Sequence, residues 1–209
     1  MKKYLNKKTI LLIISILIII AGITVGSLFG FEKSIEYRKG KLIETYIPNG
    51  YERQDIINIA KESFNTDEIL FVEIEKLNQV AGVKVTEYSQ EQLDTYINKI
   101  SEKYEIEKEK LEYHEVIVPE TKISTTIKPY ILPILLTTVL VLIYVIIKNF
   151  KANNKIRMSL NILKILVITL AIYFSFIAIF RLKFCIYTMP LALAIYIVTL
   201  LIAVNKKCE

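Results

Sequence analysis

Carboxylates are almost absent from more than half of this chain. Of its twenty-one Asp and Glu residues, twenty lie between residues 31 and 128, and only Glu209 lies outside. That window also holds fourteen Lys and Arg residues and has a net charge of −6, whereas the remaining 111 residues carry +12. A proton relay within a bilayer usually needs Asp, Glu or His at depth. The apolar parts of the chain therefore lack the groups of a stand-alone proton-coupled transporter.

Cysteine and histidine are also scarce. The chain has two cysteines, Cys185 and Cys208, and one histidine, His114, with no CxxC and no HExxH motif. Metal sites built from these residues need several of them at short spacings, so no metal is expected. We expect His114 to be a surface or edge residue. No nucleophile elbow or similar motif points to catalysis, so we expect neither an enzyme nor a cofactor.

Apolar residues, in contrast, are abundant and gather in four runs. The hydrophobic fraction is 53%, which is high for a soluble protein. The runs are residues 9–31, 130–147, 160–180 and 184–204. About twenty residues of helix cross the roughly 30 Å hydrocarbon core of a bilayer. The sequence therefore predicts an α-helical membrane protein with four transmembrane helices, the first of them an uncleaved anchor.

The placement of Lys and Arg predicts the orientation of these spans. Ten of these residues lie at the N-terminus, in the 148–159 loop and in the C-terminal tail, against two, Arg181 and Lys183, between the last two spans. Cytoplasmic loops carry the excess of positive charge. We therefore expect a multi-pass plasma-membrane protein with both termini in the cytoplasm. The basic residues outside the acidic window lie mostly at the ends of the spans, where they determine the orientation of the protein in the membrane. The sequence pI near 9.1 therefore does not indicate a nucleic-acid partner.

The chain divides into three parts on these grounds. Residues 1–31 form the cytoplasmic N-terminus and first span, residues 32–128 an extracytoplasmic domain, and residues 129–209 three further spans with short loops. Within the domain, the patterns predict strand 41–47, helix 51–64, strands 69–76 and 80–87, a helix after Ser89, and strand 111–118. The order β-α-β-β-α-β is typical of a ferredoxin-like α+β fold.

Local signals add detail to this domain. Ser89 is expected to cap the second helix, with Gln92 as its capping-box partner. The apolar stripes of the two helices are expected to be Ile56, Ile57, Ala60 and Phe64, and Leu93, Ile97, Ile100 and Tyr104. Residues 105–110 are ambiguous between helix and loop. Residues 119–128 are expected to be a polar tether to the second span.

Three glycines follow one another at helical spacing in the first span. Gly22, Gly26 and Gly30 form a G-x-x-x-G-x-x-x-G ridge, and small residues at this spacing let helices approach closely. The ridge is expected to pack against other helices of this chain, or alternatively against a partner subunit. Pro129 and Pro133 are expected to open the second span, and Pro190 to kink the fourth.

The junction after the first span carries a motif. Residues 30–44 read GFEKSIEYRKGKLIE, which resembles the SecD/SecF signature G-L-x-x-G-I-D-F-x-G-G-T-L-I-E without a gap. Matching or similar residues are Gly30, Ile35, Glu36, Tyr37, Gly40, Leu42, Ile43 and Glu44. Ser34, Lys39 and Lys41 depart from the signature.

The resemblance to the SecD/SecF family covers roughly residues 9–150. It implies an accessory membrane subunit that assists protein export, with the translocon or a SecD-like protein as partner and an unfolded secreted polypeptide as cargo. Family members normally have six spans and draw on the proton gradient through membrane-embedded Asp and Arg residues. Those positions have no counterpart here, so a partner would carry any proton relay.

A second hypothesis does not depend on export. The extracytoplasmic domain would bind a ligand or an envelope component, and the helices would serve as anchor. The carboxylates of residues 102–112 are interleaved with lysines, which indicates a solvated charged face rather than a Ca²⁺ site. Lys164, near the start of the third span, is expected to snorkel to the headgroups.

Overall fold

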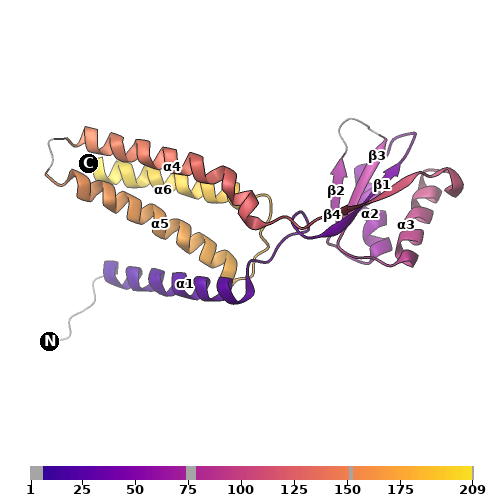
Figure 1. Cartoon of the computed structure of the whole chain (residues 1–209), viewed down its shortest axis with the longest axis horizontal. Coiled ribbons are helices and arrows are strands. Elements are labelled where there is room, and N and C mark those ends of the chain that lie inside the picture. The colour runs from indigo at the N-terminus through magenta and orange to yellow at the C-terminus, as the bar shows by residue number, and fades with distance from the viewer. Residues whose placement is uncertain (1–6, 74–78, 151–152, 209) are drawn as a thin grey trace. The chain divides into compact units, whose positions relative to one another are not determined.

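The computed structural model describes residues 7–73, 79–150 and 153–208 of the chain (Figure 1). It divides into two compact units. One contains the residues up to Lys33 and from Ile123 onward, and the other is Ser34–Lys122. We call them the helical unit and the sheet unit.

The sheet unit alternates strands and helices in the order β-α-β-β-α-β. Its elements are β1 (Gly40–Tyr46), α2 (Arg53–Phe64), β2 (Leu70–Glu73), β3 (Val80–Val85), α3 (Gln90–Lys103), a short 3₁₀ helix (Lys108–Lys110) and β4 (Tyr113–Val118). All six predicted strands and helices are present. The predicted strands 80–87 and 111–118 are shorter in the structure, and the end of the predicted strand 69–76 lies outside the described residues. The chain turns after β1, where Gly50 has φ +79° and its N–H donates to the Ile47 carbonyl at 3.0 Å.

The four strands form one antiparallel sheet in the order β2-β3-β1-β4. Each neighbouring pair is antiparallel, so β3 lies between β1 and β2, the two strands that α2 connects. The register pairs Ile43 with Val83 on one side and with Glu115 on the other. Side chains alternate across a sheet, so these three residues share the face on which the helices pack.

The core of the sheet unit lies between that face and the two helices. Its buried side chains are Ile43, Ile47, Ile56, Ala60, Phe64, Ala81, Val83, Val85, Leu93, Tyr96, Ile97, Ile100 and Leu111. The predicted stripes are largely confirmed, whereas Ile57 and Tyr104 are only half-buried. The capping box is also confirmed, because the Ser89 hydroxyl accepts from Gln92 N–H and the Gln92 side chain accepts from Ser89 N–H.

Lys84 differs from the simple alternation expected of its strand. It lies on the sheet face opposite the helices, yet it is only 3% exposed. Its ammonium donates to the carbonyls of Glu36 at 3.2 Å and Arg38 at 2.9 Å, so the segment before β1 folds over it. Burial lowers the pKa of Lys84, but the two carbonyls solvate the charge that water would otherwise solvate.

The helical unit contains, in the described residues, four helices long and apolar enough to cross a membrane. They are α1 (Lys7–Phe29), α4 (Ile123–Lys148), α5 (Lys155–Ile179) and α6 (Thr188–Cys208). The predicted multi-pass membrane protein is thereby confirmed at the level of its spans. Helix α5 packs against the other three (Figure 1).

Two expectations about proline are wrong. Helix α4 begins at Ile123, so most of the predicted tether 119–128 is helical, and Pro129 and Pro133 lie inside the helix. The hydroxyl of Thr137 donates to the Pro133 carbonyl at 2.8 Å. Pro190 is the third residue of α6. The N–H groups of the first helical turn have no carbonyl partner within the helix, so a proline there breaks no hydrogen bond and requires no kink.

The helical unit holds its helices together by close approach and polar contact. Most side chains of α1 and α4 are exposed, as lipid-facing residues are. The hydroxyl of Tyr196 in α6 lies 2.6 Å from that of Thr138 in α4, and Tyr196 is only 2% exposed. After α1, the Arg181 guanidinium donates to the Gly30 carbonyl at 3.2 Å. A cation at the C-terminal end of a helix complements the helix dipole.

Candidate binding site

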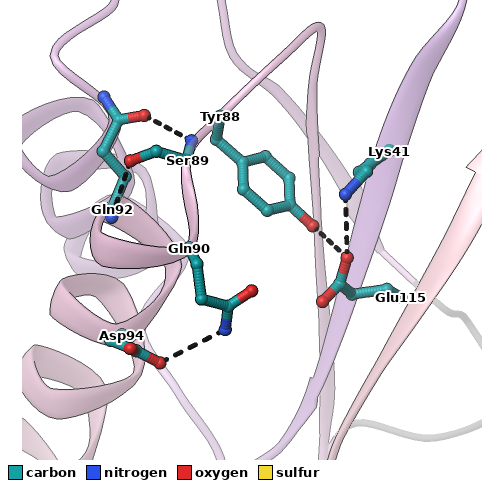
Figure 2. A network of polar contacts seen from close by, with 7 residues as sticks. All are labelled: Lys41, Tyr88, Ser89, Gln90, Gln92, Asp94 and Glu115. Atoms are coloured by element: carbon teal, nitrogen blue, oxygen red, sulfur yellow. Dashed lines mark hydrogen bonds and ion pairs between the residues drawn. The ribbon is translucent and has the colours of Figure 1, made fainter.

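Three side chains of the sheet unit meet above the β1–β4 edge of the sheet. Glu115 of β4 accepts hydrogen bonds at Oε2 from the Tyr88 hydroxyl at 2.6 Å and from Lys41 Nζ at 3.3 Å. Lys41 Nζ also lies 4.6 Å from the centre of the Tyr88 ring, within the range of a cation–π contact. Figure 2 shows the carboxylate of Glu115 at the centre of this contact. We call the three residues the Lys41–Tyr88–Glu115 triad.

Strand pairing and helix capping position the triad. Lys41 lies opposite Ile117 in the β1–β4 register, so Glu115 is its diagonal neighbour on the same face. Tyr88 stands directly before Ser89, whose capping box fixes the start of α3 (Figure 2). The Tyr88 ring also packs on Phe64, with ring centres 5.3 Å apart. This packing fixes the Tyr88 ring in the position from which its hydroxyl donates to Glu115 of β4.

The triad stabilises a negative charge on Glu115. The hydrogen bond from Tyr88, followed by the contacts with Lys41, lowers the pKa of Glu115, although partial burial opposes the shift. Burial, and then the same hydrogen bond, raises the pKa of Tyr88 above its ordinary value. Near neutral pH the carboxylate is therefore ionised and the phenol is protonated. A paired carboxylate of this kind is a poor general base, so the chemistry favours binding over catalysis.

A hollow of about 650 Å³ opens beside the triad. It is lined by residues 38–41 before and in β1, residues 86–88 before α3, and Ile117 and Glu120 at the end of β4. This volume lies within the range of small-molecule sites, about 300–1,000 Å³. Lys39 and Glu87 are exposed at its surface, whereas Arg38 is paired with Glu68 at 2.7 Å. The hollow thus offers the apolar side chain of Ile117, the ring of Tyr88 and charges of both signs.

The signature residues lie along one stretch of chain and do not form a cluster. Gly30 follows α1 with φ +65°, and the others belong to the sheet unit. Position 40 requires glycine, because a Cβ there would lie 2.6 Å from the Val85 carbonyl oxygen. Lys39, where the signature has glycine, does not adopt a positive φ.

The remaining signature residues have distinct surroundings. Ile43 is in the core, Leu42 and Glu44 are half-buried on the opposite sheet face, and Ile35 is half-buried. The Glu36 carboxylate accepts from the Ser34 hydroxyl, and the Tyr37 carbonyl accepts from Thr121 N–H at 2.9 Å.

The glycine ridge lies against α5 over part of its length. A Cβ on Gly22 would lie 2.2 Å from the Ser175 Cβ, so only glycine fits at this helix contact. A Cβ on Gly26 would lie 3.8 Å from the Ala178 Cβ, an ordinary contact. Gly30 has open space around its Cβ position and lies beyond the helix. The structure therefore places two of the three glycines against another helix of the same chain.

Sequence reasoning missed the triad. Lys41 counted only as a departure from the signature, Tyr88 lies in a connection, and Glu115 stands in a strand whose neighbour is seventy residues away in the chain. The pairing of 41–47 with 111–118 was open to prediction from the expected fold. The contact with Tyr88 depends on where the folded unit places that side chain relative to β4, which no local sequence pattern indicates.

Comparison with known proteins adds no family to this picture. In the part of the chain that the structure describes, no group of three or more His, Cys, Asp or Glu side chains could hold a metal ion. No protein-family model matches the chain, and no curated protein matches it.

Proposed function

We propose that this protein is a SecF-like accessory subunit that assists protein export at the plasma membrane. The observation that carries the proposal is the insertion of a β-α-β-β-α-β unit between the first and second of four spans, with the signature-like segment 30–44 at the junction. Its partners would be a SecD-like protein or the translocon, and an unfolded secreted polypeptide would be its cargo. The role is one of binding, without catalysis.

The proposal includes a ferredoxin-like fold for the sheet unit. In that arrangement β1-α2-β2 is a right-handed crossover unit split by a third strand between its two strands. The sheet order β2-β3-β1-β4 and the antiparallel pairing of β3 with both β1 and β2 support this assignment. Both helices pack on one face of the sheet, and β2 and β4 are its edge strands.

The proposed orientation places both termini in the cytoplasm and residues 32–128 outside. Ten Lys and Arg residues on the proposed cytoplasmic side, against two between α5 and α6, support this topology. The spans contain no Asp, Glu or His. Lys164 is exposed on α5, as a snorkelling lysine would be. We therefore assign any proton relay of the complex to another subunit.

Affinity capture of the intact chain from membranes in mild detergent tests this function. We expect translocon components or a SecD-like protein to be recovered. A Gly40→Val chain is the matched control, because the added Cβ would meet the Val85 carbonyl oxygen and displace β1. Recovery should fall with this variant. If neither partner is recovered from cells that are secreting protein, the export proposal is wrong.

A second candidate is a membrane-anchored binding or sensing module unrelated to export. The hollow of about 650 Å³ beside the triad favours it. Thermal unfolding of the intact chain in micelles would be followed against small metabolites and soluble cell-wall fragments. A ligand that raises the melting temperature of the wild-type chain, but not that of a Lys41→Met variant, would support this candidate.

A further inference from the structure

The outer edge of β4 carries unused backbone hydrogen-bonding groups. Tyr46 N–H donates to the Glu112 carbonyl at 3.0 Å, directly across the β1–β4 pair. In an antiparallel pair, hydrogen-bonded and non-bonded positions alternate. The amides and carbonyls of Tyr113, Glu115 and Ile117 therefore point away from β1. Within the described residues, no protein group hydrogen-bonds to them.

From Tyr113 to Val118, β4 contains no proline and pairs with β1 without a bulge, and Pro119 follows only after the strand ends. Soluble proteins guard edge strands with outward charges, prolines or bulges. Here the one carboxylate in the strand, Glu115, is turned onto Lys41 and Tyr88, so its charge is paired within the domain. Val116 is 42% exposed and Ile117 is 68% exposed, on opposite faces of the strand. The edge thus offers backbone groups flanked by apolar side chains.

The pattern of donors and acceptors selects an extended backbone as the occupant. Alternating N–H and C=O groups along a strand are matched by the edge of another strand. A second copy of β4 fits poorly. The antiparallel register that uses all the outward groups places Glu115 opposite Glu115 of the second copy, and like charges in that position are destabilising. Shifting by one pair in one direction places Tyr113 opposite Pro119, which has no N–H to donate. Shifting in the other direction places Ile117 opposite Leu111, whose N–H already donates to the Lys108 carbonyl at 3.3 Å.

We propose that the free edge of β4 binds an extended, apolar segment of another polypeptide as an additional strand. Backbone hydrogen bonds to Tyr113, Glu115 and Ile117 supply the affinity. Alternate side chains of the bound segment contact Val116 on one face and Ile117 on the other. Those on the Ile117 side lie next to the hollow of about 650 Å³ that Ile117 lines. The proposal rests on the proposed export function for the source of the segment, an unfolded secreted protein.

A binding assay with a synthetic strand tests the edge directly. The probe is a fluorescently labelled peptide of alternating valine and threonine, and the readout is fluorescence anisotropy with the intact chain in nanodiscs. The matched probe carries N-methyl groups on its backbone amides, which keeps the side chains and removes the donors. We expect the N-methylated probe to bind at least about tenfold more weakly.

Two variants of one residue separate backbone from side chain. Ile117→Pro removes an outward donor that β1 does not use, and proline is tolerated on the open side of an edge strand. Ile117→Ala keeps that donor and removes only apolar surface. We expect the proline variant to bind the unmethylated probe about tenfold more weakly and the alanine variant to lose less. Hydrogen exchange of β1 checks that the sheet is intact. If the proline variant unfolds the sheet, the proposal is tested instead by comparing the unmethylated and N-methylated probes on the wild-type chain.

Specific outcomes would overturn the proposal. Equal binding of the two probes, or unchanged binding by an intact Ile117→Pro chain, excludes backbone pairing at this edge. A dimer in light scattering that dissociates in Ile117→Pro would make a second copy the occupant instead. Affinity capture separates the two proposals: export components recovered by a chain that binds no probe would leave the export function standing and reject the edge. Probe binding by a chain that recovers no export components would support the edge and reject the export function.

Discussion

The sheet unit and the helical unit differ in how much apolar surface they bury within the chain. The sheet unit has a continuous core of thirteen buried apolar residues between a sheet and two helices. In the helical unit α1 and α4 expose most of their surface, and the buried cluster is small. Burial of apolar area drives folding in water, but lipid tails are as apolar as leucine, so helices in a bilayer gain from close contact and hydrogen bonds instead.

Two buried tyrosines show the difference at the scale of one hydroxyl. Tyr96 of α3 is fully buried in the core of the sheet unit, and its hydroxyl faces that of Thr45, another buried side chain, without a hydrogen bond of good geometry. Tyr196 of α6 is 2% exposed, and its hydroxyl lies 2.6 Å from the Thr138 hydroxyl of α4. Tyr96 contributes mainly through the packing of its ring in the core, whereas the hydroxyl of Tyr196 joins two helices.

The largest expected effect is in the core of the sheet unit. Ile43 is fully buried between β3, β4 and the helices, so Ile43→Ala should destabilise this unit by about 2–5 kcal/mol. Hydrogen exchange read by mass spectrometry in nanodiscs would report the two units separately. Protection should fall in α2, α3 and the strands and stay unchanged in α5. Ile117→Ala, at a 68% exposed position, is the matched control and should change stability by less than about 0.5 kcal/mol. Equal losses in both units would contradict the division into two units.

The next effect tests close approach in the helical unit. Gly22→Ala places a methyl group 2.2 Å from the Ser175 Cβ, whereas Gly26→Ala places one 3.8 Å from the Ala178 Cβ. We expect the first to cost about 1–3 kcal/mol through overpacking and the second to be tolerated. Thermal unfolding in micelles, with hydrogen exchange of α1, would measure both. Equal tolerance of the two substitutions would show that α1 and α5 are not held by contact at Gly22.

A smaller effect distinguishes the two tyrosines. Tyr196→Phe removes an interhelical hydrogen bond and should destabilise the helical unit by about 0.6 kcal/mol, and by no more than about 1.7. Tyr96→Phe removes a buried hydroxyl that forms no well-aligned hydrogen bond with its polar neighbour Thr45, so it should be close to neutral for the sheet unit. The same unfolding and exchange measurements apply. A clear loss of stability in Tyr96→Phe would show that the Tyr96 hydroxyl is hydrogen-bonded in the folded unit.

Features set by neighbouring residues were predictable from the sequence. The capping box of Ser89 and Gln92 lies within one helical turn, and the stripe of Leu93, Ile97 and Ile100 follows from helical periodicity. The four spans follow from length and apolarity. In these cases the chain segment carries its own signal, and packing agrees with it.

Features set by distant residues were not predictable. Lys84 is buried because the segment before β1 folds over it and supplies two carbonyls. Residues 123–128 read as a tether because Ser, Thr and Lys are polar, but they continue the helix of the following span. The triad needs β1, β4 and the residue before α3 to meet, and only the folded sheet unit brings these together.

The smallest expected effect concerns Glu115 and acidic pH. The contacts with Tyr88 and Lys41 hold the pKa of Glu115 below its ordinary value of 4.5. A carboxylate with a lowered pKa stabilises the folded state at a pH above its unfolded pKa, and this contribution is lost as the pH falls through the folded pKa. The sheet unit should therefore lose stability below about pH 4.5 more steeply in the wild type than in Glu115→Gln.

The helical unit provides the reference for this measurement, because its spans contain no Asp or Glu. Glu115 is partly exposed, so the difference between the wild type and Glu115→Gln should stay below about 1 kcal/mol. Unfolding of the sheet unit between neutral pH and pH 3, followed by hydrogen exchange alongside α5 in the same molecules, would measure it. Identical pH profiles for the two chains would mean that the triad does not hold together in solution. Lys41 and Tyr88, which line the hollow, would then not be held in place by Glu115. The outward amides of β4 would keep their positions, because the β1–β4 ladder alone positions them.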